Sequence, residues 1–190
     1  MQFRPILLSL VTVCSAITAF AGGPDKPLLR PDGKPYPVQR TEAEWKKRLT
    51  PEQYKILRQS GTEPAFCGRF HDNKKPGVYF CVGCDTPLFT SNEKFISGTG
   101  WPSFFQPIKS DRVLYVRDTS YGMVRTEILC ATCGGHLGHV FNDGPRPTGM
   151  RFCMNGMVLN FMELKAGKNG KISQDDVENA KWDPKKGKSH

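Results

Sequence analysis

Short apolar segments separated by Gly, Pro, Asn and Asp residues dominate the chain from Gly77 onward. This spacing is typical of β-strands joined by turns, and no long helical pattern interrupts it. We therefore expect a mainly β fold, built either as an antiparallel β-barrel or as folded sheets. The expected strands cover residues 78–82, 87–90, 113–117, 123–129, 139–142, 151–154 and 157–163.

Two short helices are expected ahead of the strands. Thr41 with Glu44, and Thr50 with Gln53, have the spacing of a capping box, in which each side chain bonds the backbone of the other residue. Pro51 stands at a first-turn position that tolerates proline. One apolar face for packing is supplied by Trp45, Leu49, Tyr54 and Leu57.

The first 21 residues have the pattern of a secretory signal peptide. Arg4 precedes an apolar run over residues 6–20, which ends in the small-x-small sequence Ala19-Phe20-Ala21. An uncleaved anchor is the alternative, but the run is shorter than the about 20 residues of a spanning helix. Lipidation of Cys14 is a weaker alternative. We expect cleavage after about Ala21 and a secreted or periplasmic protein without stable membrane association.

The rest of the chain divides by composition. Residues 22–40 are rich in Pro and Gly and predict an extended lead-in, residues 41–165 a single domain, and residues 166–190 a polar basic tail with one short helix near 173–180. The 190-residue chain has a formal net charge of +9, but its basic residues are scattered. This distribution favours a solvated basic surface, so we expect a monomer with no nucleic-acid partner.

Four of the seven cysteines form two matched pairs, Cys81-x-x-Cys84 and Cys130-x-x-Cys133. Two such pairs fit a closed tetrahedral zinc site, in which four thiolates leave no position open for substrate. We therefore expect one structural Zn²⁺ that joins two turns far apart in the sequence. Three disulfides in an exported protein, or a thioredoxin-like redox pair, are the alternatives.

Outside the cysteine pairs, each candidate residue has two interpretations, one structural and one functional. Cys153 lies in an expected strand, where it is either a buried small hydrophobe or a nucleophile whose pKa Arg151 lowers. His136 and His139 serve either proton transfer or packing. Trp101, between Gly and Pro, either lines a pocket or plugs one end of the fold, and we favour the pocket.

In combination and order, these motifs resemble the B-type peptide-methionine (R)-S-oxide reductases. The resemblance extends from about residue 41 to 163. It implies a β-rich fold with zinc away from the active site, and reduction of the R epimer of methionine sulfoxide in proteins by a thioredoxin-like reductant. The matching segments are Cys81-x-x-Cys84, Gly98-Thr99-Gly100-Trp101-Pro102-Ser103-Phe104, Cys130-x-x-Cys133, His136-Leu137-Gly138-His139-Val140-Phe141 and Arg151-Phe152-Cys153-Met154-Asn155.

The resemblance also implies roles for individual residues. Cys153 becomes the nucleophile that attacks the sulfoxide sulfur, and the oxygen of the sulfoxide needs a proton donor, for which we expect His139. Trp101 becomes the wall for the substrate methyl group. The remaining roles are the polar side of the pocket for His136, flanking positions for Arg151 and Asn155, and substrate contacts for Phe141 and Phe152.

One departure from the family concerns the thiol that resolves the sulfenic acid on Cys153. A common family pattern has this cysteine at the position of Thr99, which cannot serve. Cys67 is the remaining unpaired thiol of the mature chain, and other family members use a cysteine in this segment. We therefore expect Cys67 to be the resolving residue. The alternative function is a non-catalytic, zinc-stapled binding module with a pocket lined by Trp101.

Overall fold

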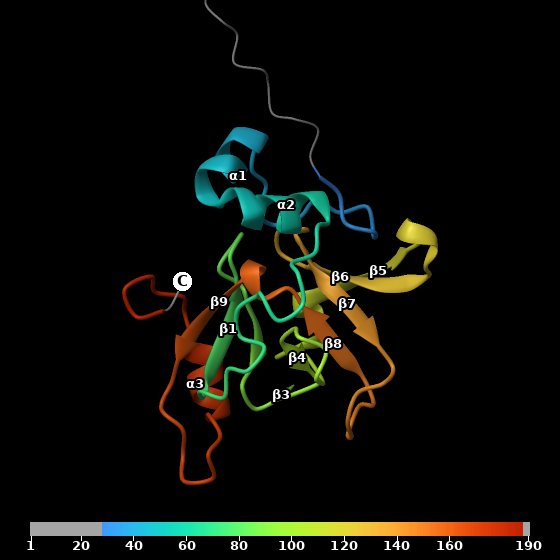
Figure 1. Ribbon diagram of the computed structural model, residues 1–190. Coiled ribbons are helices and arrows are strands. Elements are labelled where there is room, and N and C mark those ends of the chain that lie inside the picture. The colour runs from blue at the N-terminus through green and yellow to red at the C-terminus, as the bar shows by residue number, and fades with distance from the viewer. Residues whose placement is uncertain (1–27, 188–190) are drawn as a thin grey trace, which may run out of the picture.

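The computed structural model describes residues 28–187, and these residues fold into two antiparallel sheets with three short α-helices (Figure 1). One sheet has the strand order β2-β1-β9 and the other β3-β4-β8-β7-β6-β5. The prediction of a mainly β, antiparallel fold is confirmed in its folded-sheet form, because within the described residues neither sheet closes into a barrel. The elements are α1 (Glu42–Arg48), α2 (Pro51–Gln59), β1 (Gly77–Cys81), β2 (Pro87–Thr90), β3 (Lys94–Phe95), β4 (Ser103–Phe104), η1 (Ser110–Arg112), β5 (Val113–Asp118), η2 (Ser120–Gly122), β6 (Arg125–Cys130), β7 (His136–Phe141), β8 (Arg151–Met154), η3 (Gly156–Val158), β9 (Leu159–Glu163) and α3 (Gln174–Asn179).

Both predicted capping boxes are present. The Thr41 side chain accepts from the backbone of Glu44, whose carboxylate accepts from the Thr41 N–H, and Thr50 and Gln53 repeat the arrangement. Each box satisfies amide groups that the first turn of a helix otherwise leaves without partners. The two helices can therefore begin where the sequence predicts, although each is short.

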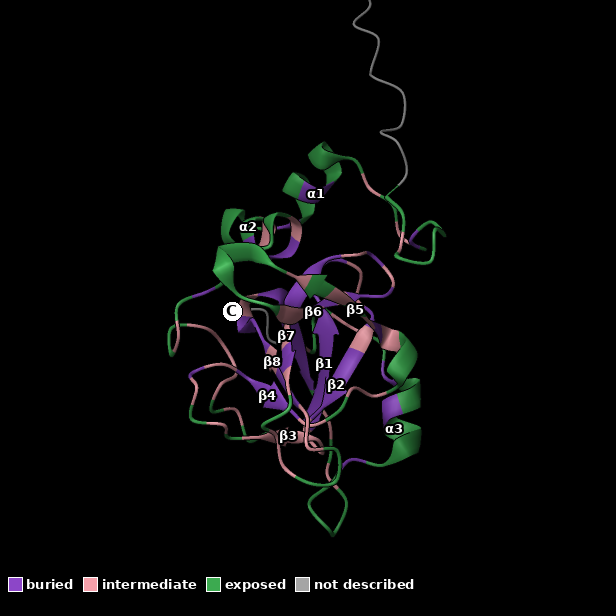
Figure 2. Ribbon diagram, turned by 90° about the vertical axis from the view of Figure 1, so that its right-hand side faces the viewer, coloured by how far each residue is buried: buried purple, intermediate pink, exposed green. Residues whose placement is uncertain are grey.

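Aromatic side chains join the two sheets. Tyr79 of β1 meets Phe104 of β4 edge-on at 5.0 Å, and Phe89 of β2 stacks on Phe104 at 4.5 Å. All three side chains are fully buried. Large apolar rings in these geometries contribute both area burial and specific contacts, so they fix one sheet against the other. Figure 2 shows this core as the purple strands, surrounded by helices and loops with exposed surfaces.

The segment expected to be a polar tail also contributes to packing. The short helix expected near 173–180 is present as α3, with Ser173 as its N-cap. Trp182 lies 5.8 Å from the ring of Phe80 on β1. A second apolar cluster thus covers the outer side of β1 and β9, and it includes Val78, Phe80, Met162, Ile172, Val177, Ala180 and Trp182.

Residues 28–40, the described part of the expected lead-in, contain a turn over residues 31–33 that is closed by one isolated bridge between Leu29 and Pro35. The expected signal peptide, residues 1–21, lies outside the described residues. Between residues 28 and 187 no helix has the length and apolar character needed to cross a membrane.

Candidate active site and metal centre

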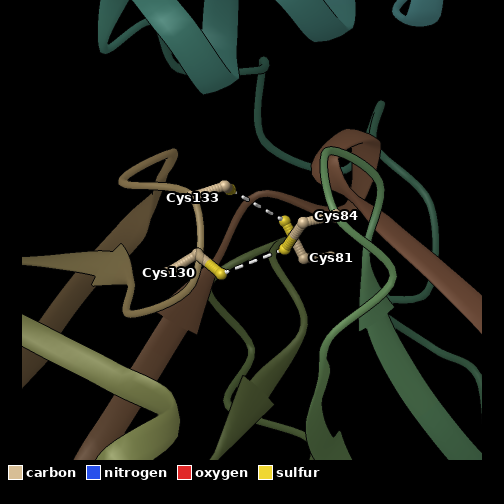
Figure 3. A group of neighbouring side chains, drawn as sticks. All are labelled: Cys81, Cys84, Cys130 and Cys133. Carbon is tan, nitrogen blue, oxygen red and sulfur yellow. Dashed lines mark hydrogen bonds between the residues drawn. The ribbon is translucent and has the colours of Figure 1, made fainter. Parts of the chain in front are cut away.

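The two cysteine pairs come together at one point (Figure 3). The four sulfur atoms lie within 4.8 Å of one another, with 3.5 Å from Cys84 to Cys130 and 3.8 Å from Cys81 to Cys133. Tetrahedral ligands with metal–sulfur bonds of about 2.3 Å are separated by about 3.8 Å, so the spacing fits a metal ion. The six cysteines of the described chain are all free, which contradicts the three-disulfide alternative.

The cysteine cluster lies where the two sheets meet. Cys81 ends β1 of the smaller sheet and Cys130 ends β6 of the larger one. A bound metal would therefore join the two sheets, as the sequence predicts for two distant turns. Three arginines from the N-terminal region donate to carbonyl groups in these turns and bring positive charge close to the thiolates: Arg40 to Gly83, Arg48 to Val82 and Arg58 to Cys133.

A second feature is a small pocket with a cavity volume of about 120 Å³ that contains Cys153. A larger hollow of about 460 Å³ lies elsewhere, beside Arg48, Arg69 and Trp182, but no cysteine or histidine lines it. Chemistry rather than volume therefore identifies the smaller pocket as the candidate active site. Its lining residues are Thr62, Trp101, Arg125, Gly138, His139, Phe141, Cys153, Met154 and Asn155.

Strand register explains how these residues meet. Directly opposed residues of antiparallel strands project from the same face. Glu127 of β6 opposes His139 of β7, His139 opposes Cys153 of β8, and Cys153 opposes Ser103 of β4. The larger sheet thus places an acid, an imidazole and a thiol in one row across its strands.

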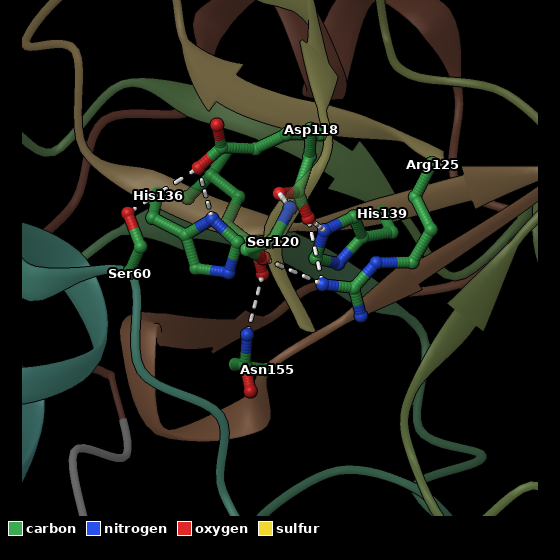
Figure 4. A network of polar contacts seen from close by, with 9 residues as sticks. Ser60, Asp118, Ser120, Arg125, His136, His139 and Asn155 are labelled. Atoms are coloured by element: carbon green, nitrogen blue, oxygen red, sulfur yellow. Dashed lines mark hydrogen bonds and ion pairs between the residues drawn. The ribbon is translucent and has the colours of Figure 1, made fainter. Parts of the chain in front are cut away.

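His136 and His139 each have a carboxylate partner (Figure 4). His139 donates from Nε2 to Asp118 at 2.8 Å, and His136 donates from Nδ1 to Glu127 at 2.5 Å. The two rings lie edge to face with centroids 5.4 Å apart. Burial, with smaller contributions from Arg125 and His136, lowers the pKa of His139 against the opposing effect of Asp118. A neutral His139 held in this way presents Nδ1 as a proton acceptor.

Burial also raises the pKa of the Cys153 thiol above its ordinary value. The Arg151 guanidinium and a hydrogen bond from Thr99 act in the opposite direction. Arg151 is itself fixed by Asp143, whose two carboxylate oxygens each accept at 2.9 Å. The expected influence of Arg151 therefore has the predicted sign, but burial outweighs it, and the thiol keeps its proton near neutral pH.

This balance predicts opposite pH shifts for two neighbouring variants. Arg151→Gln should move the pH profile of Cys153 alkylation to higher pH, because it removes a positive charge that favours the thiolate. Asp143→Asn should move the profile to lower pH, since the Asp143 carboxylate raises the pKa of Cys153. Iodoacetamide labelling of the Cys153 peptide, followed by mass spectrometry across a pH series, measures both. Shifts in the same direction would contradict the prediction.

The remaining predicted residues fall into two groups. Trp101, Phe141 and Asn155 line the pocket, and the guanidinium of Arg151 lies 4.4 Å above the Phe141 ring. Phe152 does not belong there: it points to the opposite face of β8, is 4% exposed, and packs against Phe89 in the core. Side chains alternate along a strand, so the neighbour of Cys153 faces away from it. The expected substrate contact of Phe152 therefore does not agree with its position.

Cys67 lies in an exposed turn beside the pocket. The N–H of its neighbour Phe66 donates to the carbonyl of Gly100 at 2.9 Å, which places the turn against the loop that carries Thr99 and Trp101. The Thr99 side chain lies close enough to the Cys153 sulfur to lower the pKa of that thiol. The structure thus brings the Cys67 segment to the loop that contacts Cys153, with both thiols free.

Comparison with known proteins agrees with this geometry. A family model for the SelR domain matches residues 49–163. The chain is 57% identical over 128 residues to a peptide methionine sulfoxide reductase MsrB of Leptospira interrogans, across 67% of this chain and 98% of that protein. It is also 57% identical over 133 residues to an MsrB of Methanosarcina barkeri, across 70% and 94% of the two chains. The chain belongs to the SelR family.

The SelR match contains both cysteine pairs and every residue of the Cys153 pocket, and it ends before α3. The resemblance to B-type peptide-methionine (R)-S-oxide reductases is therefore confirmed. The apolar cluster that α3 and Trp182 form on the smaller sheet uses a segment outside the SelR match.

Several residues of this SelR site were missed by sequence reasoning. The pairing of β5, β6 and β7 brings Asp118, Arg125 and Glu127 to the histidines. The sequence could have indicated these three residues, because the turn at Cys130-x-x-Cys133 joins β6 to β7 and limits which of their residues can pair. Glu63 gave no such signal, since it lies in an irregular segment and meets its partners only in the folded chain.

Proposed function

We propose that this protein reduces methionine-(R)-sulfoxide in oxidised proteins to methionine, with Cys153 as the nucleophile. The observation that carries the proposal is the shared pocket of Cys153, His139 and Trp101 in a chain of the SelR family. The curated relatives are peptide methionine sulfoxide reductases. The SelR match over residues 49–163 spans Cys67, His139 and Cys153.

In the first step, the sulfur of Cys153 attacks the sulfoxide sulfur, and methionine leaves while the oxygen stays on Cys153 as a sulfenic acid. The proton that the thiol loses is the proton that the oxygen gains, so the step balances. Nδ1 of His139 is the group that would take this proton and return it to the oxygen, because Nε2–H is already directed at Asp118. Trp101 supplies an apolar wall for the methyl group.

In the second step, the thiol of Cys67 attacks the sulfenic sulfur of Cys153. The sulfur–sulfur bond forms, the sulfur–oxygen bond breaks, and water leaves with the proton of Cys67. A thioredoxin-like dithiol then reduces the disulfide by exchange and is itself oxidised. The exposure of Cys67 supports this order, since the reductant must reach one sulfur of the disulfide.

Cys67→Ser tests the second step. Turnover with a dithiol reductant should fall by at least about tenfold, because the sulfenic acid on Cys153 loses its partner, while the first equivalent of methionine still forms. Rapid quenching quantifies methionine, and dimedone labelling detects the sulfenic acid on Cys153. Wild-type protein treated alike should give a Cys67–Cys153 disulfide by mass spectrometry. Unchanged turnover in Cys67→Ser would remove Cys67 from the mechanism.

We also propose that the ion held by the four paired cysteines is Zn²⁺ with a structural role. An all-thiolate set at tetrahedral spacing suits zinc and leaves no ligand position for water or substrate. The ion would stabilise the junction of the two sheets, and the chemistry of Cys153 proceeds without it.

Export is the proposal that the sequence of residues 1–21 supports. Cleavage would remove Cys14 and leave four cysteines for metal, one to attack and one to resolve. Cytosolic thioredoxin does not reach an exported enzyme, so the reductant would be a thioredoxin-like dithiol on the far side of the membrane. The protein would act as a monomer on oxidised proteins or peptides, without nucleic acid.

A further inference from the structure

A buried acid, Glu63, attaches the segment that carries Cys67 to η3, the short helical turn that follows the strand of Cys153. Glu63 is 4% exposed. One carboxylate oxygen accepts from the N–H of Gly156 at 2.6 Å, and the other accepts from the N–H of Met157 at 2.7 Å. Gly156 follows Cys153 by three residues, so the acid binds the chain just past the nucleophile.

The same carboxylate contacts the turn on its other side. A Cβ atom on Gly68 would lie 2.0 Å from the nearer carboxylate oxygen, so the Gly68 backbone packs directly on the acid. Gly68 immediately follows Cys67. The Glu63 carboxylate is therefore enclosed between the residue after one thiol and the residues after the other.

The backbone of Glu63 adds two bonds to the pocket itself. Its N–H donates to the side-chain oxygen of Asn155 at 3.1 Å, and its carbonyl accepts from Nε1 of Trp101 at 3.1 Å. A change of side chain leaves both of these groups in place. The carboxylate can thus be altered while the backbone bonds to Trp101 and Asn155 remain.

Arg69 closes the segment from the other end. Its guanidinium donates to the carbonyls of Met157 and Leu159 at 3.0 and 3.3 Å. Residues 64–68 are consequently a short loop whose two ends, Glu63 and Arg69, are both bonded to the backbone of residues 156–159. Cys67 lies in that loop. A loop anchored at both ends limits the positions that the Cys67 sulfur can reach.

We propose that Glu63 is a positioning residue for the second chemical step, which fixes the Cys67 turn where its thiol can reach the oxidised Cys153. The proposal rests on the proposed function, in which Cys67 resolves the sulfenic acid. Preorganised geometry accelerates a reaction between two groups of one chain, and its loss slows that reaction alone. Glu63 therefore governs disulfide formation and leaves oxygen transfer from the substrate unaffected.

The test compares two rates in one single-turnover experiment. After mixing with methionine-(R)-sulfoxide, quenched samples give methionine release, and alkylation with mass spectrometry gives the Cys67–Cys153 disulfide. Glu63→Gln should slow disulfide formation by about tenfold or more, the effect of losing one charge-assisted hydrogen bond, and change methionine release by less than about twofold. Glu93→Gln, a change at a partly buried acid whose side chain bonds Thr90, should alter neither rate.

Gly68→Ala provides an independent variant that leaves Glu63 intact. Its Cβ would displace the carboxylate, so it should slow the same step, and it decides the matter if Glu63→Gln does not fold. Equal slowing of both rates, or unchanged disulfide formation, would overturn the positioning role. Unchanged turnover in Cys67→Ser would instead show that the second step of the proposed function is wrong.

Discussion

Cys153→Ser should abolish methionine formation, in the steady state and in the first turnover alike. A serine hydroxyl in the same pocket is a far weaker nucleophile and cannot form a sulfenic acid. Removing the nucleophile of a covalent mechanism typically costs more than about 10⁴-fold in rate, and we expect a loss of that order. The measurement is methionine released from the R epimer by an excess of enzyme, with no reductant present.

Two controls make this result specific. Cys67→Ser removes the other unpaired thiol and should keep the first equivalent of methionine, so the pair of variants separates attack from resolution. Cys153→Ser should also retain the metal, because its sulfur is not part of the four-cysteine cluster. If Cys153→Ser still released one equivalent, another residue would be the nucleophile. The binding-module alternative predicts no release from any variant or from the wild type.

The sequence predicts an element well when the residues that determine it are neighbours in the chain. The strands expected at 87–90 and 151–154 are β2 and β8 with those bounds. β7 begins at His136 rather than at 139. Glycine is uncommon inside strands, so Gly138 made the sequence pattern of this strand look shorter than it is. β3 and β4, two residues each, depend on pairing with β8 and have no apolar pattern of their own.

The site residues divide in the same way, into those that a local motif indicates and those that only distant contacts bring to the site. Cys153, His139 and Trp101 stand in motifs of unusual composition, and the structure brings all three into one pocket. Phe152 is adjacent to Cys153 in the sequence, but the alternation of side chains along β8 directs it to the opposite face, into the core. Glu63 could not be predicted, because the amide groups that its carboxylate binds are more than ninety positions away in the sequence.

The cysteine pairs allow a second large effect to be predicted. Cys130→Ser should prevent stoichiometric zinc binding and remove much of the stability of the fold. Cys130 is fully buried where the two sheets meet, and three arginine side chains bond carbonyl groups of the turns that carry the four cysteines. Apparent free energies of structural zinc sites, about 10–16 kcal/mol, are comparable with the whole stability of a domain.

The core formed by Tyr79, Phe89 and Phe104 would remain, so we expect a weakened fold rather than a fully unfolded chain. A loss of about 5 kcal/mol lowers the melting temperature of a domain of this size by roughly 10–20 °C. Differential scanning calorimetry measures the shift, and metal analysis measures zinc per chain. Cys67→Ser is the matched control, because it removes an exposed thiol and should keep both values. A Cys130→Ser protein with full zinc content and unchanged melting would show that these cysteines do not form the metal site.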